Sequence, residues 1–487
     1  MTSPNSKLSQ AAAQAELYLN QHFENALEEL KQLAKIPSVS FAGFDPAHVR
    51  KSAEATAVLL KKVGFENVEV LNFEDAHPYV YADYLKAGPD APTALLYAHH
   101  DVQPAGRDEL WLTPAFTPTL KEGPGGARLY GRGTADDKAG ILVHAAALEA
   151  FLKTSGSCPL NLKVVIEGEE EIGSGHLHSF LKAYAKKLQA DVIILTDTAN
   201  FDCGKPALTI ALRGLIGVDV EVRALTKAVH SGMWGGPVPD PVVALAKVLA
   251  SLVDEDGRIA VPGIREMVTP LTEEEIERMK KIPFEEKLFR EQVGMVQGAK
   301  LLTEGPNPIA QLWRFPSLTI TAIQASERKE AANRINDTAW ARVTIRTAPG
   351  MDAPKTAALL KAHMEKVVPW GLEISVTGGE HGSGAWAIDP TGPAFEAAKI
   401  AMTKGYGEEP LMIGCGGSIP FVQPFAEALG GVPALLIGVE DPYTNAHGEN
   451  ESLLVSDLRK ACVSQIHLFA EIAERLRPAR ALQKEVP

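Results

Sequence analysis

The pattern of hydrophobic and polar positions predicts helices and strands that alternate through the first part of the chain. Apolar residues recur at helical spacing over residues 8–34, and residues 51–63 form a second helical stretch. Apolar strands are expected at "TALLYAHHDV", "LNLKVVIEG" and "ADVIILTD", separated by the helices "DKAGILVHAAALEAFLKT" and 176–188. A Gly/Pro-rich loop is expected between the first strand and its helix. Such alternation is typical of a doubly wound, mostly parallel sheet, so we expect an α/β fold.

The pattern changes after residue 213. Alternating strands are expected at "GLIGVDVEVRAL", "SLTITAIQA" and "AWARVTIRTA", together with the helices "DPVVALAKVLASLV" and "APKTAALLKAHMEKVV". These elements predict an α+β unit with helices on one face of a sheet. Helix–strand alternation returns after residue 379. We therefore expect a catalytic domain in two segments, 1–213 and 380–487, interrupted by an inserted domain at 214–379.

Composition and charge narrow the class of protein. Of the 487 residues, 45% are hydrophobic and 22% are charged, the usual balance of a globular protein. A formal net charge of −13 disfavours a nucleic-acid or anionic-membrane partner. No apolar run of about 18 residues predicts a membrane-spanning helix, and no signal sequence is visible. Four scattered cysteines without a C-x-x-C pair fit reduced thiols, so a cytoplasmic location is expected.

Polar side chains lie where the predicted strands end, which is the edge at which open α/β sheets build binding sites. In "AHHDV", His99 and Asp101 project to the same side of an extended strand, so Asp101 can orient His99 as a metal ligand. In "YGRGTADDKAG", Asp136 stands where a dinucleotide fingerprint needs its third glycine, and its charge would repel a pyrophosphate. This excludes nucleotide binding, although the acid pair could also cap the following helix.

Three further strand ends carry candidate ligands. The stretch "VVIEGEEEIGSG" places four glutamates after a strand with no basic residue among them, and these include Glu170 and Glu171. Asp197 closes "VIILTD", and His447 lies in the loop after "PALLIGV". Taken singly, these could be a solvated turn, a strand-end cap and a surface loop. Taken together they form a mixed nitrogen and oxygen set without thiolates, which suits a pair of zinc or similar divalent ions that share one carboxylate.

The motifs also occur in the order of a known family. From residue 36 to residue 451 they read "IPSVS", "HHDVQPA", "YGRGTADDKAG", "EEIGS", "HSGMWGG", "TIRTAPGMD", "GGSIP" and "AHGENE". In this order the sequence resembles the cocatalytic zinc metallopeptidases, which include aminoacylase, carboxypeptidase G, succinyl-diaminopimelate desuccinylase and the carnosine-type cytosolic dipeptidases. The long insertion with "LWRFPSLTITAI" is more similar to that of the dipeptidase branch than to the shorter insertion of the aminoacylase branch.

The resemblance implies two divalent metal ions per subunit, with zinc expected and manganese or cobalt as alternatives. It assigns five ligands by position: His99 and Asp197 for one metal, Glu171 and His447 for the other, and a bridging Asp136. The peptide bond between Asp136 and Asp137 is expected to be cis, as in the family.

The resemblance also assigns catalytic and substrate-binding roles. Glu170 is the expected general base, and Asp101 is the expected partner of the metal-binding histidine. His230, in "HSGMWGG", is expected to reach the partner subunit's active site in a homodimer and to stabilise the tetrahedral oxyanion. Arg346 is expected to bind the terminal carboxylate of the substrate through its planar guanidinium. Further substrate contacts are expected from Asn333, Gly417 and Ser418.

Two departures from the dipeptidase pattern fall in the expected substrate pocket. Gly414 and Cys415 stand where those enzymes carry an arginine–glutamate pair, and Asn336 stands where a proline is expected. These positions bear on the choice of substrate and leave the set of metal ligands intact.

The resemblance implies a metal-dependent hydrolase that cleaves an amide bond next to a free carboxylate, with a dipeptide as the expected substrate. An N-acyl-amino-acid deacylase of the desuccinylase or deacetylase type is the first alternative. A catalytically inactive relative that acts as a binding protein is the second. The inserted domain is expected to serve as a lid and as the dimerisation domain. Neither nucleic acid nor a membrane is an expected partner.

Overall fold

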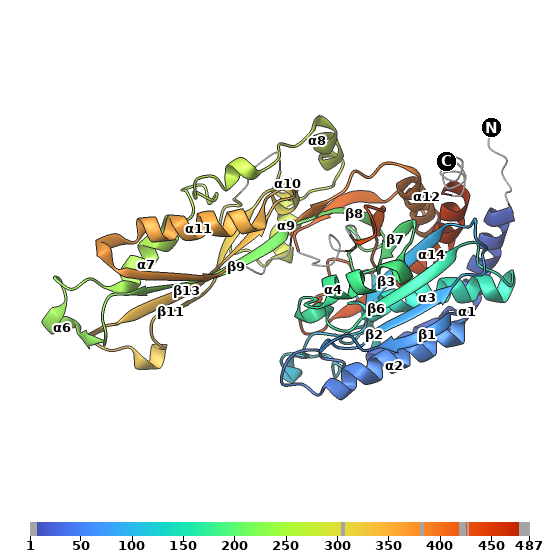
Figure 1. Cartoon of the computed structure of the whole chain (residues 1–487), viewed down its shortest axis with the longest axis horizontal. Coiled ribbons are helices and arrows are strands. Elements are labelled where there is room, and N and C mark those ends of the chain that lie inside the picture. Colours follow the sequence, from blue (N-terminus) through green and yellow to red (C-terminus); the bar gives the residue numbers. More distant parts are fainter. Residues whose placement is uncertain (1–6, 303–306, 380–383, 418–424, 426–427, 477–487) are drawn as a thin grey trace. The chain divides into compact units, whose positions relative to one another are not determined.

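The computed structural model describes residues 7–302, 307–379, 384–417, 425 and 428–476 (Figure 1). Internal contacts divide the chain into two compact units. The first comprises Met1–Ile210, Asp389–Ile413 and Phe421–Pro487, and the second comprises Ala211–Ile388 and Gly414–Pro420. The expected functional domains, 1–213 with 380–487 and the inserted 214–379, stay a prediction.

A large mixed sheet forms the centre of the first unit, although β15 and the last residues of β8 and β16 are assigned to the second unit. Over the described residues its strands lie in the order β1-β2-β6-β3-β7-β17-β8-β15, with β16 also paired to β8. β6, β3, β7 and β17 pair in parallel, and the outer strands β1, β2, β8 and β15 pair antiparallel. The predicted α/β fold is confirmed, with its parallel strands at the centre. The bounds are β1 Glu66–Leu71, β2 Tyr79–Tyr84, β3 Thr93–His99, β6 Asn161–Glu167, β7 Val192–Leu195, β8 Ala207–Leu212, β15 Trp386–Ala387, β16 Leu411–Cys415 and β17 Ala434–Leu436.

Helices pack against this sheet and against one another. Their bounds are α1 Lys7–Ala34, α2 Pro46–Val63, α3 Lys138–Thr154, α4 Leu177–Ala183, α5 Ala185–Leu188, α12 Pro393–Tyr406 and α14 Val455–Arg475. α3 is buried along most of its length because it contacts α1, α14 and β3. α2 begins at Pro46 rather than at residue 51, because the backbone N–H of Ala47 donates to the side chain of Asp45 and proline suits the first helical turn. Within the described ranges, no helix is both long and apolar enough to cross a bilayer.

A small antiparallel sheet corrects one prediction. Its strands lie in the order β18-β5-β4, with bounds Ser452–Leu454, Gly126–Tyr130 and Thr119–Gly123. The sequence predicts a loop before Asp136, but part of this segment forms the β4–β5 hairpin. Gly125 and Gly126 allow its tight turn, because they adopt positive φ values of 80° and 130°. Since β18 pairs with β5, the segments that carry Asp136 and His447 lie next to each other.

The second unit holds a four-stranded antiparallel sheet with helices on one face, as predicted. Its strands lie in the order β11-β13-β9-β14, with bounds Ser317–Gln324, Thr338–Thr347, Gly214–Arg223 and Glu373–Gly378. α7 (Pro241–Ala250) and α11 (Ala353–Val367) contact these strands, and alternate residues of β9 and β13 form the hydrophobic core with them. Shorter elements are β10 Val229–His230, α6 Ser231–Trp234, α8 Glu273–Lys280, α9 Glu286–Gln292, α10 Pro308–Arg314 and β12 Arg334–Ile335.

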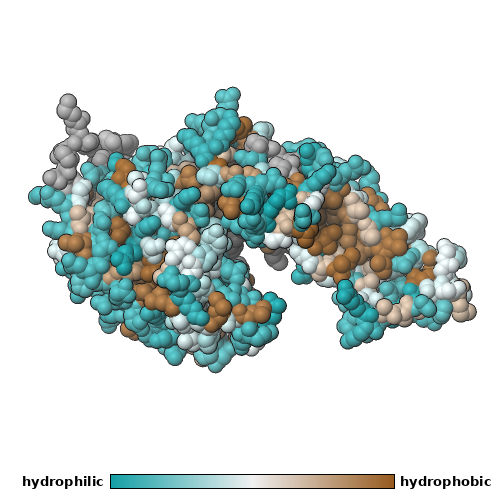
Figure 2. All heavy atoms as spheres, turned by 180° about the vertical axis from the view of Figure 1, so that it is seen from behind, coloured by the Kyte–Doolittle hydropathy of each residue, from teal (hydrophilic) through white to brown (hydrophobic). Residues whose placement is uncertain are grey.

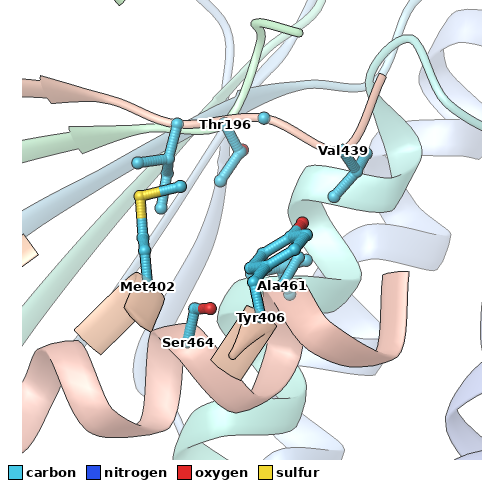
Figure 3. A pocket seen from close by; sticks show the side chains of 9 residues that line it. Thr196, Met402, Tyr406, Val439, Ala461 and Ser464 are labelled. Carbon is cyan, nitrogen blue, oxygen red and sulfur yellow. The ribbon is translucent and has the colours of Figure 1, made fainter. Parts of the chain in front are cut away.

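A small cavity lies in the core of the first unit, among α3, α12, α14 and the residues that follow β7 and β17 (Figure 3). Its volume of about 10 Å³ is at the lower limit of what one water molecule needs. It is therefore a gap in the packing rather than a substrate site. Mostly apolar residues line it: Val143, Thr196, Met402, Tyr406, Ile437, Gly438, Val439, Ala461 and Ser464.

Candidate active site

Strand ends bring four of the predicted site residues to one edge of the large sheet. His99 ends β3, which lies between β6 and β7. Glu170 and Glu171 lie in a short 3-10 turn just after β6, and Asp197 follows shortly after β7. Because these neighbouring strands run in parallel, their carboxyl ends meet at the same edge.

Asp136 lies between the two predicted histidine ligands. It comes from the turn before α3, with its Oδ1 3.0 Å from His99 Nε2 and its Oδ2 3.1 Å from His447 Nε2. His447 Nε2 is also 3.3 Å from Glu171 Oε2. The structure thus brings all five predicted metal ligands together, and the peptide bond after Asp136 is cis. Two groups form here whose ligand atoms lie within 4.8 Å of one another: His99, Glu170 and Asp197, and Asp136, Glu171 and His447.

Asp101 is fully buried and holds its neighbours in place. His99 Nδ1 lies 3.1 Å from the carbonyl oxygen of Asp101 and 3.4 Å from its Oδ1. Both are acceptors, so Nδ1 carries the proton and leaves Nε2 available to a metal. The Asp101 carboxylate also accepts hydrogen bonds from the backbone N–H groups of Glu170 (3.2 Å) and Glu171 (3.1 Å) and from the hydroxyl of Ser40 (2.7 Å).

Burial and mutual proximity perturb the pKa values of the clustered acids. Burial is the main cause that raises the pKa of Glu170 to about 7, and nearby carboxylates add to it. The same causes raise the pKa of Glu171 and of Asp197 well above the usual range. Burial acts on Asp136 too, but hydrogen bonds from the two histidines lower its pKa. Without a cation these crowded acids therefore tend to keep their protons, and divalent cations bound by oxygen and imidazole nitrogen would favour their ionised form.

The other two glutamates of the run have partners away from the predicted ligands. Glu167 accepts a hydrogen bond from the Tyr97 hydroxyl (2.6 Å). Glu169 is 2% exposed and accepts hydrogen bonds from the Tyr79 hydroxyl (3.2 Å) and from the backbone N–H of His176 (2.9 Å). The four carboxylates thus divide into two at the site and two that bind neighbouring residues.

Three residues that hold the ligands have no role assigned from the sequence. Gln103 donates to Glu171 from its backbone N–H (3.1 Å) and from its side-chain amide (2.7 Å). Arg132 and Glu451 form a buried pair next to the backbone of Asp136. All three lie in motifs quoted above, but the letters of a motif do not show which residues bind a metal and which bind another side chain.

The predicted residues of the second unit lie near opposite ends of β13. His230 and Asn333 lie together, because β10 pairs with β12 and the N–H of Ser231 donates to the carbonyl of Asn333 (3.0 Å). Asn333 comes shortly before β13 in the chain, so both residues lie near the start of this strand. Arg346 lies near its end. About 26 Å of extended strand, at roughly 3.3 Å per residue, separates that start from Arg346. Within one chain, His230 and Asn333 therefore lie far from Arg346.

Gly417 lies near the end of β13 that carries Arg346. Arg213 donates to the carbonyl of the residue before Gly417 (3.0 Å) and to the hydroxyl of Ser317 (3.0 Å). Ser317 is directly opposite Arg346 in the β11–β13 pair. Arg213 therefore links the segment of Gly417 to the strand position beside Arg346. The predicted Ser418 lies outside the described residues.

Known proteins resemble the chain over most of its length. Residues 95–471 match Peptidase family M20/M25/M40. The cysteinylglycine-S-conjugate dipeptidase of Corynebacterium striatum is 32% identical over 381 residues, which cover 77% of this chain and 80% of that protein. The Cys-Gly metallodipeptidase DUG1 of Saccharomyces cerevisiae is 30% identical over 465 residues, which cover 91% of this chain and 95% of that one. The crystal structure of human carnosine dipeptidase 1 matches with a TM-score of 0.82 and 28% identity, over 97% of this chain and 100% of that one.

The fold, the cluster of acids and imidazoles and these matches define a metallopeptidase, which is a hydrolase. The chain belongs to peptidase family M20/M25/M40. The membership predicted from the order of the motifs is confirmed, and so is the likeness to the dipeptidase branch. The prediction that the protein is an enzyme is confirmed as well.

Proposed function

We propose that the protein is a metal-dependent dipeptidase that hydrolyses the peptide bond next to a free carboxylate. The observation that carries this is the position of Asp136 between His99 and His447, with a Glu170 oxygen 4.0 Å from His99 Nε2. The names of its relatives, which are dipeptidases, support the substrate class.

Two divalent ions, zinc in our proposal, fit the residues present. Carboxylate oxygens and imidazole nitrogens without thiolates are ligands that zinc, manganese and cobalt share. Bound there, the ions would lower the pKa of a water molecule and polarise the scissile carbonyl. The residues that would hold them are His99 and Asp197 for one ion, Glu171 and His447 for the other, and Asp136 for both.

Glu170 suits the role of general base. Its side chain is 14% exposed, so a water molecule can reach it. Its pKa is about 7 in the metal-free site and bound cations would lower it, so at neutral pH the carboxylate is ionised and can accept a proton. Glu170 takes the proton from the attacking water and delivers it to the leaving amine. Asp101 positions this carboxylate because it binds the backbone N–H of Glu170.

Arg346 binds the terminal carboxylate of the dipeptide in this proposal, and Gly417 and Ser418 add donors beside it. A planar guanidinium offers two parallel hydrogen bonds to a carboxylate. The half-buried position of Arg346 supports the role, because burial strengthens a charged hydrogen bond.

We propose a homodimer in which His230 and Asn333 serve the partner subunit's active site. Both residues lie at the end of β13 that is remote from Arg346. Figure 2 shows hydrophobic residues gathered on the surface of the second unit. Large apolar side chains of this unit are exposed, and such surface is typical of subunit interfaces. They include Met233, Trp234, Ile320 and Ile323.

We also place the enzyme in the cytoplasm. Its four cysteines are free, which supports a reducing compartment.

A substrate panel tests the dipeptidase proposal. The purified protein is loaded with zinc, manganese or cobalt and assayed on Ala-Ala-type dipeptides beside N-acetyl and N-succinyl amino acids. We expect the dipeptides, which carry a free ammonium group, to give the higher kcat/KM. A preference for the acylated compounds would make the protein a deacylase, and no hydrolysis of either set would contradict the proposed activity.

A mixing experiment tests the homodimer. Glu170→Gln and His230→Ala should each be nearly inactive alone, because every site then lacks one group. In a mixed dimer, one of the two sites combines an intact Glu170 with the partner's intact His230. Random mixing of co-expressed chains should therefore restore about a quarter of wild-type activity. Activity that stays at the level of the separate variants, or a monomer by light scattering, would overturn the proposal.

A further inference from the structure

Arg132 and Glu451 form an ion pair that is buried beside the predicted metal ligands. Arg132 Nη1 lies 2.7 Å from Glu451 Oε2, and the two side chains are 1% and 0% exposed. Among the described residues, neither belongs to a group that could hold a metal ion. A buried ion pair loses its hydration, so it is stable only where further hydrogen bonds satisfy both groups. Those further bonds lead to the segments that carry the ligands.

The Glu451 carboxylate binds the backbone that carries Asp136. Its Oε1 accepts hydrogen bonds from the N–H groups of Ala135 (3.0 Å) and Asp136 (3.2 Å), and its Oε2 accepts one from the N–H of Gly133 (3.0 Å). With the bond from Arg132, the carboxylate receives four hydrogen bonds that are strengthened by its charge. Glu451 therefore fixes the turn whose aspartate lies between the two histidines.

Arg132 extends this connection to two more segments. Its Nη2 donates to the carbonyl oxygens of Pro104 and Gly448, each at 3.1 Å. Pro104 lies shortly after Asp101, and Gly448 directly follows His447. The ion pair thus joins the segment after β3, the turn before α3 and the loop before β18.

The loop of His447 depends on such bonds more than the strand ends do. His447, Asn445 and Asn450 have φ values of 63°, 55° and 65°, a region that residues other than glycine rarely adopt. The His447 side chain is 58% exposed, whereas that of His99, at the end of a buried strand, is 0% exposed. Hydrogen bonds rather than packing therefore hold His447 in place.

We propose that Glu451 and Arg132 are positioning residues that hold Asp136 and His447 where they would bind the two metal ions. The proposal rests on the metal ligands proposed above and goes beyond them, since neither residue is one of those ligands or a proposed substrate contact. Loss of the pair should weaken the metal position of His447 more than the position of His99, because β3 holds His99 independently.

Cobalt titration of Glu451→Gln tests this proposal. The full chain is freed of metal with a chelator, titrated with Co²⁺ and followed by its visible absorption, which reports ligand geometry. Wild type should bind two ions per chain, in two binding steps. The step that His447→Ala weakens is the binding of the ion that His447 would hold, and we call it the His447 step. In Glu451→Gln an NH₂ group replaces one accepting oxygen and faces N–H donors. We expect the dissociation constant of the His447 step to rise about tenfold or more, and that of the other step to change less.

The exposed pair of Arg107 and Glu449 offers a matched control. Arg107 Nε lies 2.9 Å from Glu449 Oε1, so this pair also joins the segment after β3 to the loop before β18, but its side chains are 68% and 22% exposed. Exposed ion pairs contribute little, so Glu449→Gln should leave both dissociation constants within about twofold of wild type.

Each outcome decides for or against the positioning role. A folded Glu451→Gln protein with wild-type constants overturns it. If that variant does not fold by circular dichroism, Arg132→Lys decides, because lysine keeps the charge and loses the fork that reaches Pro104 and Gly448. Weaker binding in the His447 step then supports the role, whereas unchanged binding, or failure of both variants to fold, overturns it. Fewer than two ions bound to wild type would refute the metal pair itself, whatever the variants do.

Discussion

The substitution Glu170→Gln tests the proposed catalytic carboxylate independently of the other three glutamates of the run. Glutamine keeps the shape of the side chain but cannot accept a proton at neutral pH. The Glu170 side chain is 14% exposed, and the bond from its backbone N–H to Asp101 does not involve the carboxylate. The fold should therefore survive, whereas proton transfer from water to the leaving amine is lost.

The expected size of the effect follows from the role of a general base. Such a group contributes about 10²–10⁴-fold to a rate, or roughly 3–5 kcal/mol of transition-state stabilisation. We expect kcat to fall within this range and KM to change by less than about threefold. In wild type, kcat/KM should fall as the pH decreases through the pKa of Glu170, because only the ionised form accepts a proton. That pKa is about 7 before cations bind, and bound cations lower it, so the fall should lie below neutral pH.

Glu169→Gln is the matched control, because it makes the same change in charge one residue away. Glu169 binds Tyr79 and His176, so its replacement should lower the free energy of unfolding by about 1–3 kcal/mol. Its kcat should stay within about threefold of wild type, since its carboxylate has partners away from the ligands. Initial rates on a dipeptide and thermal unfolding measure both variants. If Glu170→Gln stayed active while Glu169→Gln was stable but inactive, Glu170 would not be the base. The division of the four glutamates into two at the site and two that bind neighbouring residues would then be wrong as well.

Three further predictions concern the orientation of ligands, the metals and the packing. Asp101→Asn should lower zinc affinity and kcat about 10–100-fold, and wild-type affinity in equilibrium dialysis would contradict its orienting role. A chelator should lower the melting temperature more at neutral pH than near pH 5. The reason is that the pKa of Asp197 is raised in the folded, metal-free protein. Such a group destabilises the fold as the pH rises from its unfolded pKa of about 4 toward its folded pKa. A chelator effect on the melting temperature that does not depend on pH would count against this account. Gly438→Ala should lower the yield of folded protein, because its Cβ would lie 1.3 Å from the carbonyl oxygen of Thr198, whereas Gly175→Ala, with no atom within 4 Å, should unfold like wild type.

The sequence predicts best those elements whose pattern is set by burial alone. α1 spans Lys7–Ala34 against a predicted 8–34, because its apolar stripe continues through the whole helix. The start of α2 and the β4–β5 hairpin depend instead on single residues, the Asp45 cap and the Gly125–Gly126 turn. Whether a strand pairs in parallel or antiparallel is harder still to predict from the sequence. β2 and β3 are both buried throughout, yet β2 pairs antiparallel with β6 and β3 pairs in parallel with it.

The candidate ligands could be found from the sequence because each one stands at a strand end or in a charged motif. Which carboxylates share a metal position follows only from the family resemblance, because the residue pattern by itself does not show it. Glu169 and Glu171 differ only in the direction of their side chains, which the turn after β6 decides. The pairing of Arg132 with Glu451 joins residues 319 positions apart, and no local pattern indicates it.

The departure at Gly414 concerns the segment beside Arg346, the residue that we propose to bind the carboxylate of the substrate. A Cβ at Gly414 would lie 2.5 Å from the Cβ of Trp313 and 2.6 Å from its Cγ. The side-chain space that an arginine needs in the dipeptidase pattern is therefore occupied here by Trp313, which is 9% exposed. Gly414 belongs to the segment that Arg213 links to the strand position opposite Arg346. If Arg346 binds the carboxylate as proposed, an apolar ring in place of a charge here would alter what the substrate contacts beside it, whereas the predicted metal ligands lie at strand ends of the first unit.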